Sequence, residues 1–289
     1  MPGWTDALPA FDLPAAPRRV DELLSAAPGV VEVVRAEVPA GRFLVICSSA
    51  PLALAFEATL FDLLAENRYP APRPRRARSG SLIARLPSDG GAAACYAWPV
   101  GEELSPARAT QPQLLEAGRL LARLHQLGEA HPAKVADGSD AKALLCRCEA
   151  GPQRDALAEV LSVPLEPLPS GALHGGICPG RALFIGDRCS AVLPSGVACF
   201  GPLAIDLGEA AVGFLCEERP LLSLRALVLG YQSLRRLLPE EVQALPSVLR
   251  LAAAREGARR AARGAAHAIS ALETLRALGD DEIRAVACA

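Results

Sequence analysis

The sequence predicts an α+β protein of two lobes, a small β-rich N-lobe followed by a larger helical C-lobe. The chain has 289 residues, enough for two packed units. Strand-like runs dominate the N-terminal third around one long helical pattern, whereas nearly everything after Ala204 has helical spacing. With 51% hydrophobic and 21% charged residues, the composition is that of an ordinary globular protein and excludes a disordered chain.

Charge and cysteine content narrow the function classes. Lys+Arg 30 against Asp+Glu 32 give a net charge of −2, and aromatic residues make up only 4%, so we expect no nucleic-acid partner. No apolar run has the ~20 residues that a membrane span needs, and the first residues lack a signal-peptide pattern. The nine cysteines are scattered in apolar contexts, which is typical of reduced thiols. We therefore expect a cytoplasmic protein with no membrane partner.

The elements of the N-lobe follow from its turn residues. Residues 1–25 are Pro-rich and are expected to form an N-terminal arm with one short helix at Val20–Leu24. Residues 26–100 are expected to form the N-lobe, with a hairpin turn at Pro39–Arg42 and a helix over Pro51–Asn67. The predicted strands are Val30–Val38, Phe43–Cys47, Ser81–Leu86 and Ala94–Trp98.

Residues 101–289 are expected to form the helical C-lobe. Thr110 and Gln113 have the spacing of a capping box, which predicts the start of a helix. Residues 171–200 break into short apolar segments separated by Gly, Pro and Ser, which indicates loops and small hairpins. From Ala204 onward the pattern is helical, so this lobe contains most of the predicted helices.

The segment from Leu173 to Ala210 contains the most informative motifs. It reads LHGGICPGRALFIGDRCSAVLPSGVACFGPLAIDLGEA. This resembles the catalytic segment of the protein-kinase-like small-molecule phosphotransferases, the superfamily of aminoglycoside and choline kinases. It is most similar to kinase-like homoserine kinases, whose pattern is close to HGDLxxxNxLF, then VIDF, then PLAYDLA. The runs GRLLARLHQL, GYQSLR and ALPSVLRLAA resemble helices of the same family. The resemblance implies a bilobal protein-kinase-like fold.

The resemblance also implies which residues would carry phosphoryl transfer, and several of these are changed. Gly176 replaces the catalytic base of HGD, Arg181 replaces the metal-binding Asn, and Pro194 replaces the metal-binding Asp of VIDF. A guanidinium cannot donate a lone pair to a metal ion. Ile46 stands where related kinases often have a phosphate-binding lysine, and no lysine occurs in the N-lobe. The family's glycine-containing nucleotide loop is expected to be shortened or absent.

These losses predict a pseudokinase, a catalytically inactive homologue that acts as a binding or regulatory protein. Phosphoryl transfer needs a base, metal ligands and a cation on the phosphates, and these parts act as a unit. We therefore expect no cofactor, no metal and no catalytic residue at the degenerate positions, which are His174, Gly176, Arg181 and Pro194. The partner is expected to be an unknown protein or a small ligand in the interlobe cleft. The alternative is an ATP- and magnesium-dependent homoserine-type kinase with a relocated carboxylate such as Asp187 or Glu209.

Other polar residues have structural interpretations. Asp206, at the Asp of PLAYDLA, is expected to cap the following helix, and His174 is expected to stabilise the turn before the lost base. Glu57 occupies the helix position that would hold the phosphate-binding lysine, but it has no lysine to pair with. His125, on the apolar face of its helix, is expected to be a core histidine.

Two arginine clusters have both a structural and a functional interpretation. The first precedes a strand and is expected to be a solvated edge; its members are Arg68, Arg73, Arg75, Arg76 and Arg78. The second gathers on one helix face, either as a solvated face or, with Arg181, as a ligand or anion patch; its members are Arg255, Arg259, Arg260 and Arg263. Cys146 and Cys148 lack the second pair that a zinc site needs.

Overall fold

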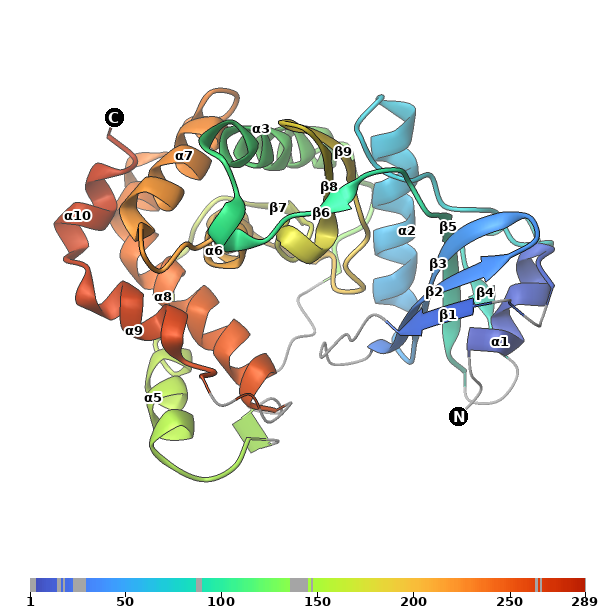
Figure 1. The fold of residues 1–289 in the computed structure, drawn as a ribbon, viewed down its shortest axis with the longest axis horizontal. Helices are drawn as coiled ribbons and strands as arrows, with labels where there is room; N and C mark the ends of the chain where they lie inside the picture. The colour runs from blue at the N-terminus through green and yellow to red at the C-terminus, as the bar shows by residue number, and fades with distance from the viewer. Residues whose placement is uncertain are drawn as a thin grey trace.

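The computed structural model describes residues 4–14, 17, 19–22, 30–86, 90–135, 145–146, 148–262, 265 and 267–288. The predicted α+β, two-lobed fold is confirmed, with helix α2 standing between the N-terminal sheet and the C-terminal helices (Figure 1). The N-terminal lobe is built on an antiparallel sheet in the order β1-β2-β3-β5-β4. Its elements are α1 (Trp4–Ala7), η1 (Leu8–Phe11), β1 (Arg19–Glu22), β2 (Val30–Val38), β3 (Gly41–Ser48), α2 (Pro51–Glu66), β4 (Ala84–Arg85) and β5 (Ala92–Ala97).

Strand β3 shows how this lobe is packed on both faces of its sheet. Side chains alternate between faces with a period of two along a strand. Val45 and its same-face neighbours pack against the N-terminal segment, where Leu8 and Phe11 are fully buried. Ile46 and Leu44 face the opposite way and pack against helix α2. The sheet therefore holds α2 in a fixed position beside the C-terminal lobe.

The prediction of a helix at Val20–Leu24 is wrong for the residues that the structure describes. Arg19–Glu22 form strand β1, which pairs antiparallel with β2. A single helical turn is marginal in isolation, whereas pairing with an existing strand satisfies the backbone of so short a segment. The last two residues of the predicted helix, 23 and 24, lie outside the described residues. Within the predicted arm, residues 4–13 contribute Leu8 and Phe11 to the core of the lobe.

The C-terminal lobe is mainly helical, with two small antiparallel sheets, β10-β7 and β6-β8-β9. Its strands are β6 (Glu102–Glu103), β7 (Ser170–Leu173), β8 (Ala182–Ile185), β9 (Arg188–Val192) and β10 (Cys199–Pro202). Its helices are η2 (Pro106–Arg108), α3 (Gln111–Gly128), α5 (Pro152–Leu161), η3 (Pro179–Arg181), α6 (Leu203–Gly213), α7 (Pro220–Gln232), α8 (Pro239–Ala261), α9 (Ser270–Ala277) and α10 (Asp280–Ala285).

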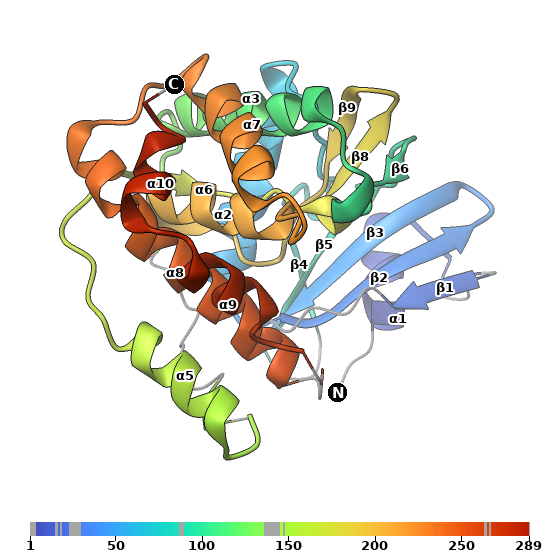
Figure 2. The same ribbon diagram turned by 60° about the vertical axis from the view of Figure 1, so that its left-hand side comes forward.

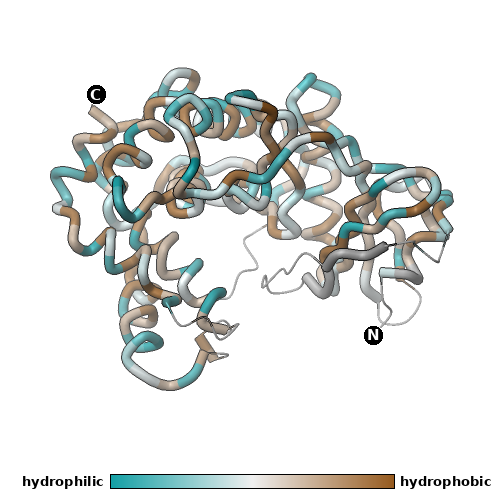
Figure 3. The backbone as a smooth tube through the Cα atoms, in the orientation of Figure 1, coloured by the Kyte–Doolittle hydropathy of each residue, from teal (hydrophilic) through white to brown (hydrophobic). Residues whose placement is uncertain are grey.

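Helices α3 and α7 lie side by side at the top of this lobe (Figures 1 and 2). The predicted capping box is confirmed: Thr110 Oγ1 accepts from the Gln113 backbone N–H at 3.4 Å, and Gln113 Oε1 accepts from the Thr110 backbone N–H at 2.9 Å. Hydrophobic and hydrophilic residues alternate along the lobe's helices (Figure 3), which leaves one face of each for the core. That core is continuous from α3 through α6 and α7 to α8.

The arginines ahead of β4 form surface ion pairs. Arg73 Nε lies 2.7 Å from Asp62 Oδ1, and Arg76 Nη2 lies 3.2 Å from Asp62 Oδ2. Arg78 pairs with Asp12 in the same way. These contacts agree with a solvated, charge-balanced edge. Among the described residues, no helix has both the length and the apolar character needed to cross a membrane.

Candidate functional site

The loop at His174–Gly176 is held by one buried carboxylate. Asp206, on the first turn of α6, is fully buried and accepts hydrogen bonds from three successive backbone N–H groups. Its Oδ2 lies 2.7 Å from the His174 nitrogen, and its Oδ1 lies 2.9 Å from that of Gly175 and 2.6 Å from that of Gly176. The predicted helix-capping role of Asp206 is therefore wrong, because α6 follows Pro202 without any side-chain cap.

A histidine and a tyrosine complete the support of Asp206. His125 Nε2 lies 3.1 Å from Asp206 Oδ2, and His125 Nδ1 lies 2.7 Å from the hydroxyl of Tyr231 on α7. Burial by itself raises the pKa of Asp206, but the hydrogen bonds from His125 and from the His174 backbone N–H outweigh it, so the pKa lies below its ordinary value. His125 is a satisfied core histidine, as predicted.

A second loop, Leu193–Ala198, lies directly against the first. The fully buried His174 has a pKa lowered chiefly by desolvation, which favours a neutral ring whose Nε2–H donates to the Leu193 carbonyl at 2.8 Å. Ser195 Oγ donates to the His174 carbonyl oxygen at 2.5 Å. His174 thus stabilises the packing of the two loops, which bring Pro194 and Gly176 into one region.

Glu57 joins this region from the N-terminal lobe. Its side chain, on α2, is buried, and it accepts from the backbone N–H of Gly196 at 3.0 Å and of Ala198 at 3.4 Å. Burial raises the pKa of Glu57, although these hydrogen bonds and the positive charge of Arg181 oppose the shift. Glu57 therefore does not pair with a lysine. It connects the two lobes by binding the Leu193–Ala198 loop, in which Pro194 stands in place of a metal-binding residue.

Arg181 folds back onto the first loop. Its Nη1 donates to the Gly175 carbonyl oxygen at 2.5 Å, and its own carbonyl accepts from the Leu193 N–H at 2.8 Å. The structure therefore brings together Gly176, Arg181 and Pro194, the three positions that the sequence singled out. Sequence reasoning did not find Ser195 or Tyr231, whose roles depend on contacts between distant segments; for Tyr231, the signal was its place in GYQSLR.

The residues at these positions do not fit the magnesium ion that the fold family implies. Mg²⁺ requires oxygen ligands in octahedral geometry. Gly176, Arg181 and Pro194 offer no side-chain oxygen, and the carboxylates of Asp206 and Glu57 are engaged by backbone N–H groups. Among the described residues, no group of three or more His, Cys, Asp or Glu side chains has the arrangement of a metal site.

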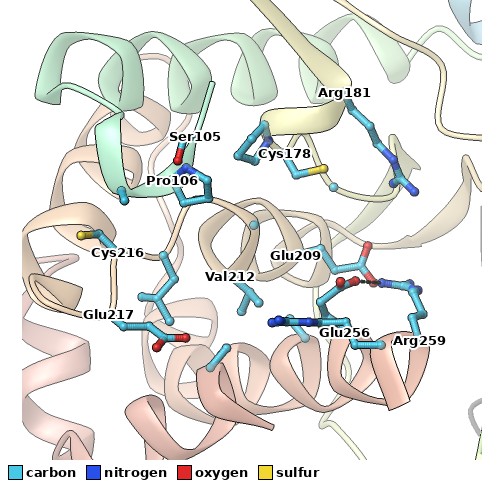
Figure 4. A pocket seen from close by; sticks show the side chains of 18 of the residues that line it. Ser105, Pro106, Cys178, Arg181, Glu209, Val212, Cys216, Glu217, Glu256 and Arg259 are labelled. Atoms are coloured by element: carbon cyan, nitrogen blue, oxygen red, sulfur yellow. Dashed lines mark hydrogen bonds and ion pairs between the residues drawn. The ribbon is translucent and has the colours of Figure 1, made fainter. Parts of the chain in front are cut away.

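A cavity of about 550 Å³ opens beside Gly176, within the C-terminal lobe (Figure 4). Arg181 and Arg259 lie toward one end and Glu217 toward the other. Other residues that line it include Ser105, Cys178, Glu209, Cys216, Glu218, Glu256 and Arg260. The wall therefore presents both signs of charge, which suits a small polar molecule better than an apolar one.

The second arginine cluster is only partly at this cavity. Arg259 lines it and forms an ion pair with Glu209 at 3.2 Å, while Arg255 approaches the same carboxylate at 3.6 Å. Arg263, the remaining member of the predicted patch, lies outside the described residues. Asp187, one of the two candidate relocated carboxylates, sits in the exposed β8–β9 turn and accepts from the Thr110 hydroxyl at 3.0 Å.

The fold and the motif positions are those of the small-molecule phosphotransferase family. Residues 32–245 match the phosphotransferase enzyme family, so the chain belongs to that family. It is 31% identical over 219 residues to homoserine kinase of Rhizobium meliloti, a match that covers 70% of this chain and 66% of that protein. It is 30% identical over 240 residues to homoserine kinase of Caulobacter sp., covering 76% and 73% respectively. The match thus spans about two thirds of the first relative's length.

Two solved structures are similar in fold. An amicoumacin kinase aligns with a TM-score of 0.68 at 13% identity, over 93% of this chain and 89% of that one. A microcompartment-associated aminopropanol kinase aligns with a TM-score of 0.65 at 19% identity, over 98% and 97%. At these identities the likeness establishes the protein-kinase-like fold and nothing about substrate.

Proposed function

We propose that this chain is a non-catalytic member of the phosphotransferase family that works by binding a small polar molecule in the cavity beside Gly176. The observation that carries the proposal is the meeting of Gly176, Arg181 and Pro194 in one region, where phosphoryl transfer would require a base and metal ligands. The cavity, in contrast, is large enough for a small ligand, and charged side chains line its wall. Loss of chemistry without loss of a binding site favours a binding or regulatory role, with no resident cofactor.

The surface around Ile46 supports this proposal. Ile46 is fully buried in an apolar cluster with Leu44 and Tyr96, at the position that the resemblance gives to a phosphate-binding lysine. Trp98 packs on this cluster and also on Leu183 of the C-terminal lobe, so its indole contacts both lobes. Ile46 itself therefore offers no compensation for the charge of a triphosphate, and the nearby cations, Arg35 and Arg42, line a separate cavity beside Trp98.

The second candidate is an ATP-dependent, homoserine-type kinase with a relocated base. The observation in its favour is Glu209, whose carboxylate lies beside Gly176 and lines the cavity. A relocated base alone does not restore phosphoryl transfer, because metal ligands are needed as well and the residues at positions 181 and 194 supply none. This candidate therefore explains less of the geometry than the first.

The direct test is ADP release by the purified protein with ATP, Mg²⁺ and L-homoserine or 1-amino-2-propanol. The homoserine kinase of Caulobacter sp. serves as the positive control. We expect no release above the rate without acceptor. Acceptor-dependent turnover that rises with protein concentration would reject the non-catalytic role and support the second candidate.

Restoring the lost base alone should not restore activity. Gly176 has φ +89, and a Cβ there would lie 3.0 Å from Glu209 Cβ, so Gly176→Asp introduces strain as well as a carboxylate. We expect this variant to melt at a lower temperature than the parent and to release no ADP in the same assay. Measurable turnover in Gly176→Asp would show that a metal ion is held by residues other than those at positions 181 and 194.

A further inference from the structure

Glu209 places a carboxylate where the side chain of residue 176 would otherwise begin. It lies on α6, three residues after the loop-holding Asp206. A Cβ built on Gly176 would be 3.0 Å from Glu209 Cβ and 3.6 Å from its Oε2. The space of the lost loop carboxylate is thus taken by a helix carboxylate, and both could not occupy it without rearrangement.

The two oxygens of Glu209 have different surroundings. Oε1 faces α8, where Arg259 Nη2 lies at 3.2 Å and Arg255 Nη1 at 3.6 Å. Oε2 faces Gly176, and no described residue donates a hydrogen bond to it. The side chain is only 9% exposed, and its exposed part is on the cavity wall (Figure 4). One oxygen is therefore anchored by two arginines, and the other is available to a molecule in the cavity.

We infer that Glu209 Oε2 accepts a hydrogen bond from a hydroxyl group of the bound molecule, which makes Glu209 the residue that selects hydroxylated ligands. The inference rests on the proposed function in that both use the same cavity. A carboxylate fixed by two guanidinium groups accepts charge-assisted hydrogen bonds and loses little conformational entropy when a ligand binds. Glu217, at the other end of the cavity, makes no ion pair with the described residues and suits an ammonium group on the same molecule.

The inference is tested with matched ligands that differ by one hydroxyl. L-homoserine and L-2-aminobutyrate share a carbon skeleton, and calorimetry on the full chain gives the Kd of each. A hydrogen bond to a charged acceptor predicts that L-homoserine binds about tenfold to a hundredfold more tightly. Glu209→Ala should abolish that preference, whereas Glu209→Gln, which keeps an acceptor oxygen and the side-chain shape, should retain part of it.

Asp187→Ala is the control, because Asp187 lies in the exposed β8–β9 turn and does not line the cavity. This variant should keep the preference for L-homoserine. Equal binding of both ligands to the parent protein, no binding of L-homoserine, or equal loss of preference in Asp187→Ala would each overturn the inference. ADP release that depends on Glu209 would instead reject the non-catalytic role while supporting this assignment of Glu209.

Discussion

Asp206→Asn is expected to be among the most destabilising single substitutions in this protein. The buried carboxylate accepts three backbone N–H groups and contacts His125. An asparagine would turn an NH₂ group toward at least one of those donors and leave it unsatisfied. Removing one partner from a buried charged network costs about 3–5 kcal/mol, which corresponds to a melting temperature lowered on the order of 10 °C. Denaturant unfolding followed by circular dichroism measures the difference.

Asp187→Asn is the control for this substitution, because Asp187 lies in an exposed turn. We expect its free energy of unfolding to stay within about 0.5 kcal/mol of the parent value. Equal stability of Asp206→Asn and the parent would contradict the account of the loop.

The carboxylate of Asp206 also predicts that the free energy of unfolding depends on pH. The pKa of Asp206 in the folded protein lies below its ordinary value of 3.8, so the unfolded chain binds the proton more readily. The stabilisation is therefore complete above that ordinary value and is lost as pH falls toward the lower folded pKa. Asp206→Asn should lack this component, so the stability gap between variant and parent should narrow on acidification below about pH 4.

Gly118→Ala and Gly230→Ala should each separate helices α3 and α7. A methyl group at Gly118 would overlap the Leu227 carbonyl oxygen and lie 2.7 Å from the Tyr231 nitrogen. A methyl group at Gly230 would overlap the backbone of Leu115 in the same way. Backbone atoms cannot rotate aside as a side chain can, so each substitution should cost on the order of 4 kcal/mol or more.

The effect should extend to the loop at Gly176. Tyr231 is on α7 and contacts His125, which in turn contacts Asp206, so a displaced α7 removes that support. Because the first substitution already separates the helices, the double variant should lose much less than the sum of the two single losses. Gly180→Ala is the control, since a Cβ there meets nothing within 4 Å. Additive losses, or a stable Gly118→Ala variant, would contradict this packing.

Local patterns predicted most of the fold. The hairpin of β2 and β3, the proline that opens α2 and the capping box of α3 are each specified by residues close together in the chain. Strand β1 was not predictable in this way, because its conformation depends on pairing with β2 rather than on its own four residues. Short segments of this kind take their structure from the neighbour that they bind.

The candidate site, like the fold, could be predicted from the sequence only in part. The motif positions of Gly176, Arg181 and Pro194 identified which groups are missing, because the resemblance aligned them residue by residue. The sequence did not show where the remaining carboxylates point. Asp206 binds the loop rather than its own helix end, and Glu209 reaches position 176 from a separate element, because both arrangements depend on how α6 packs against that loop.

The central claim, that this protein does not use Mg²⁺–ATP, is tested most directly by melting curves with ATP, with and without excess Mg²⁺. A ligand that binds only the folded state adds about 2.7 kcal/mol of stability at a hundred times its Kd. Because Gly176, Arg181 and Pro194 supply no metal ligand, we expect Mg²⁺ to produce no additional shift at any ATP concentration. A small shift that is the same with a chelator would reflect an anion at Arg181. A saturable shift that requires Mg²⁺ would contradict the non-catalytic account.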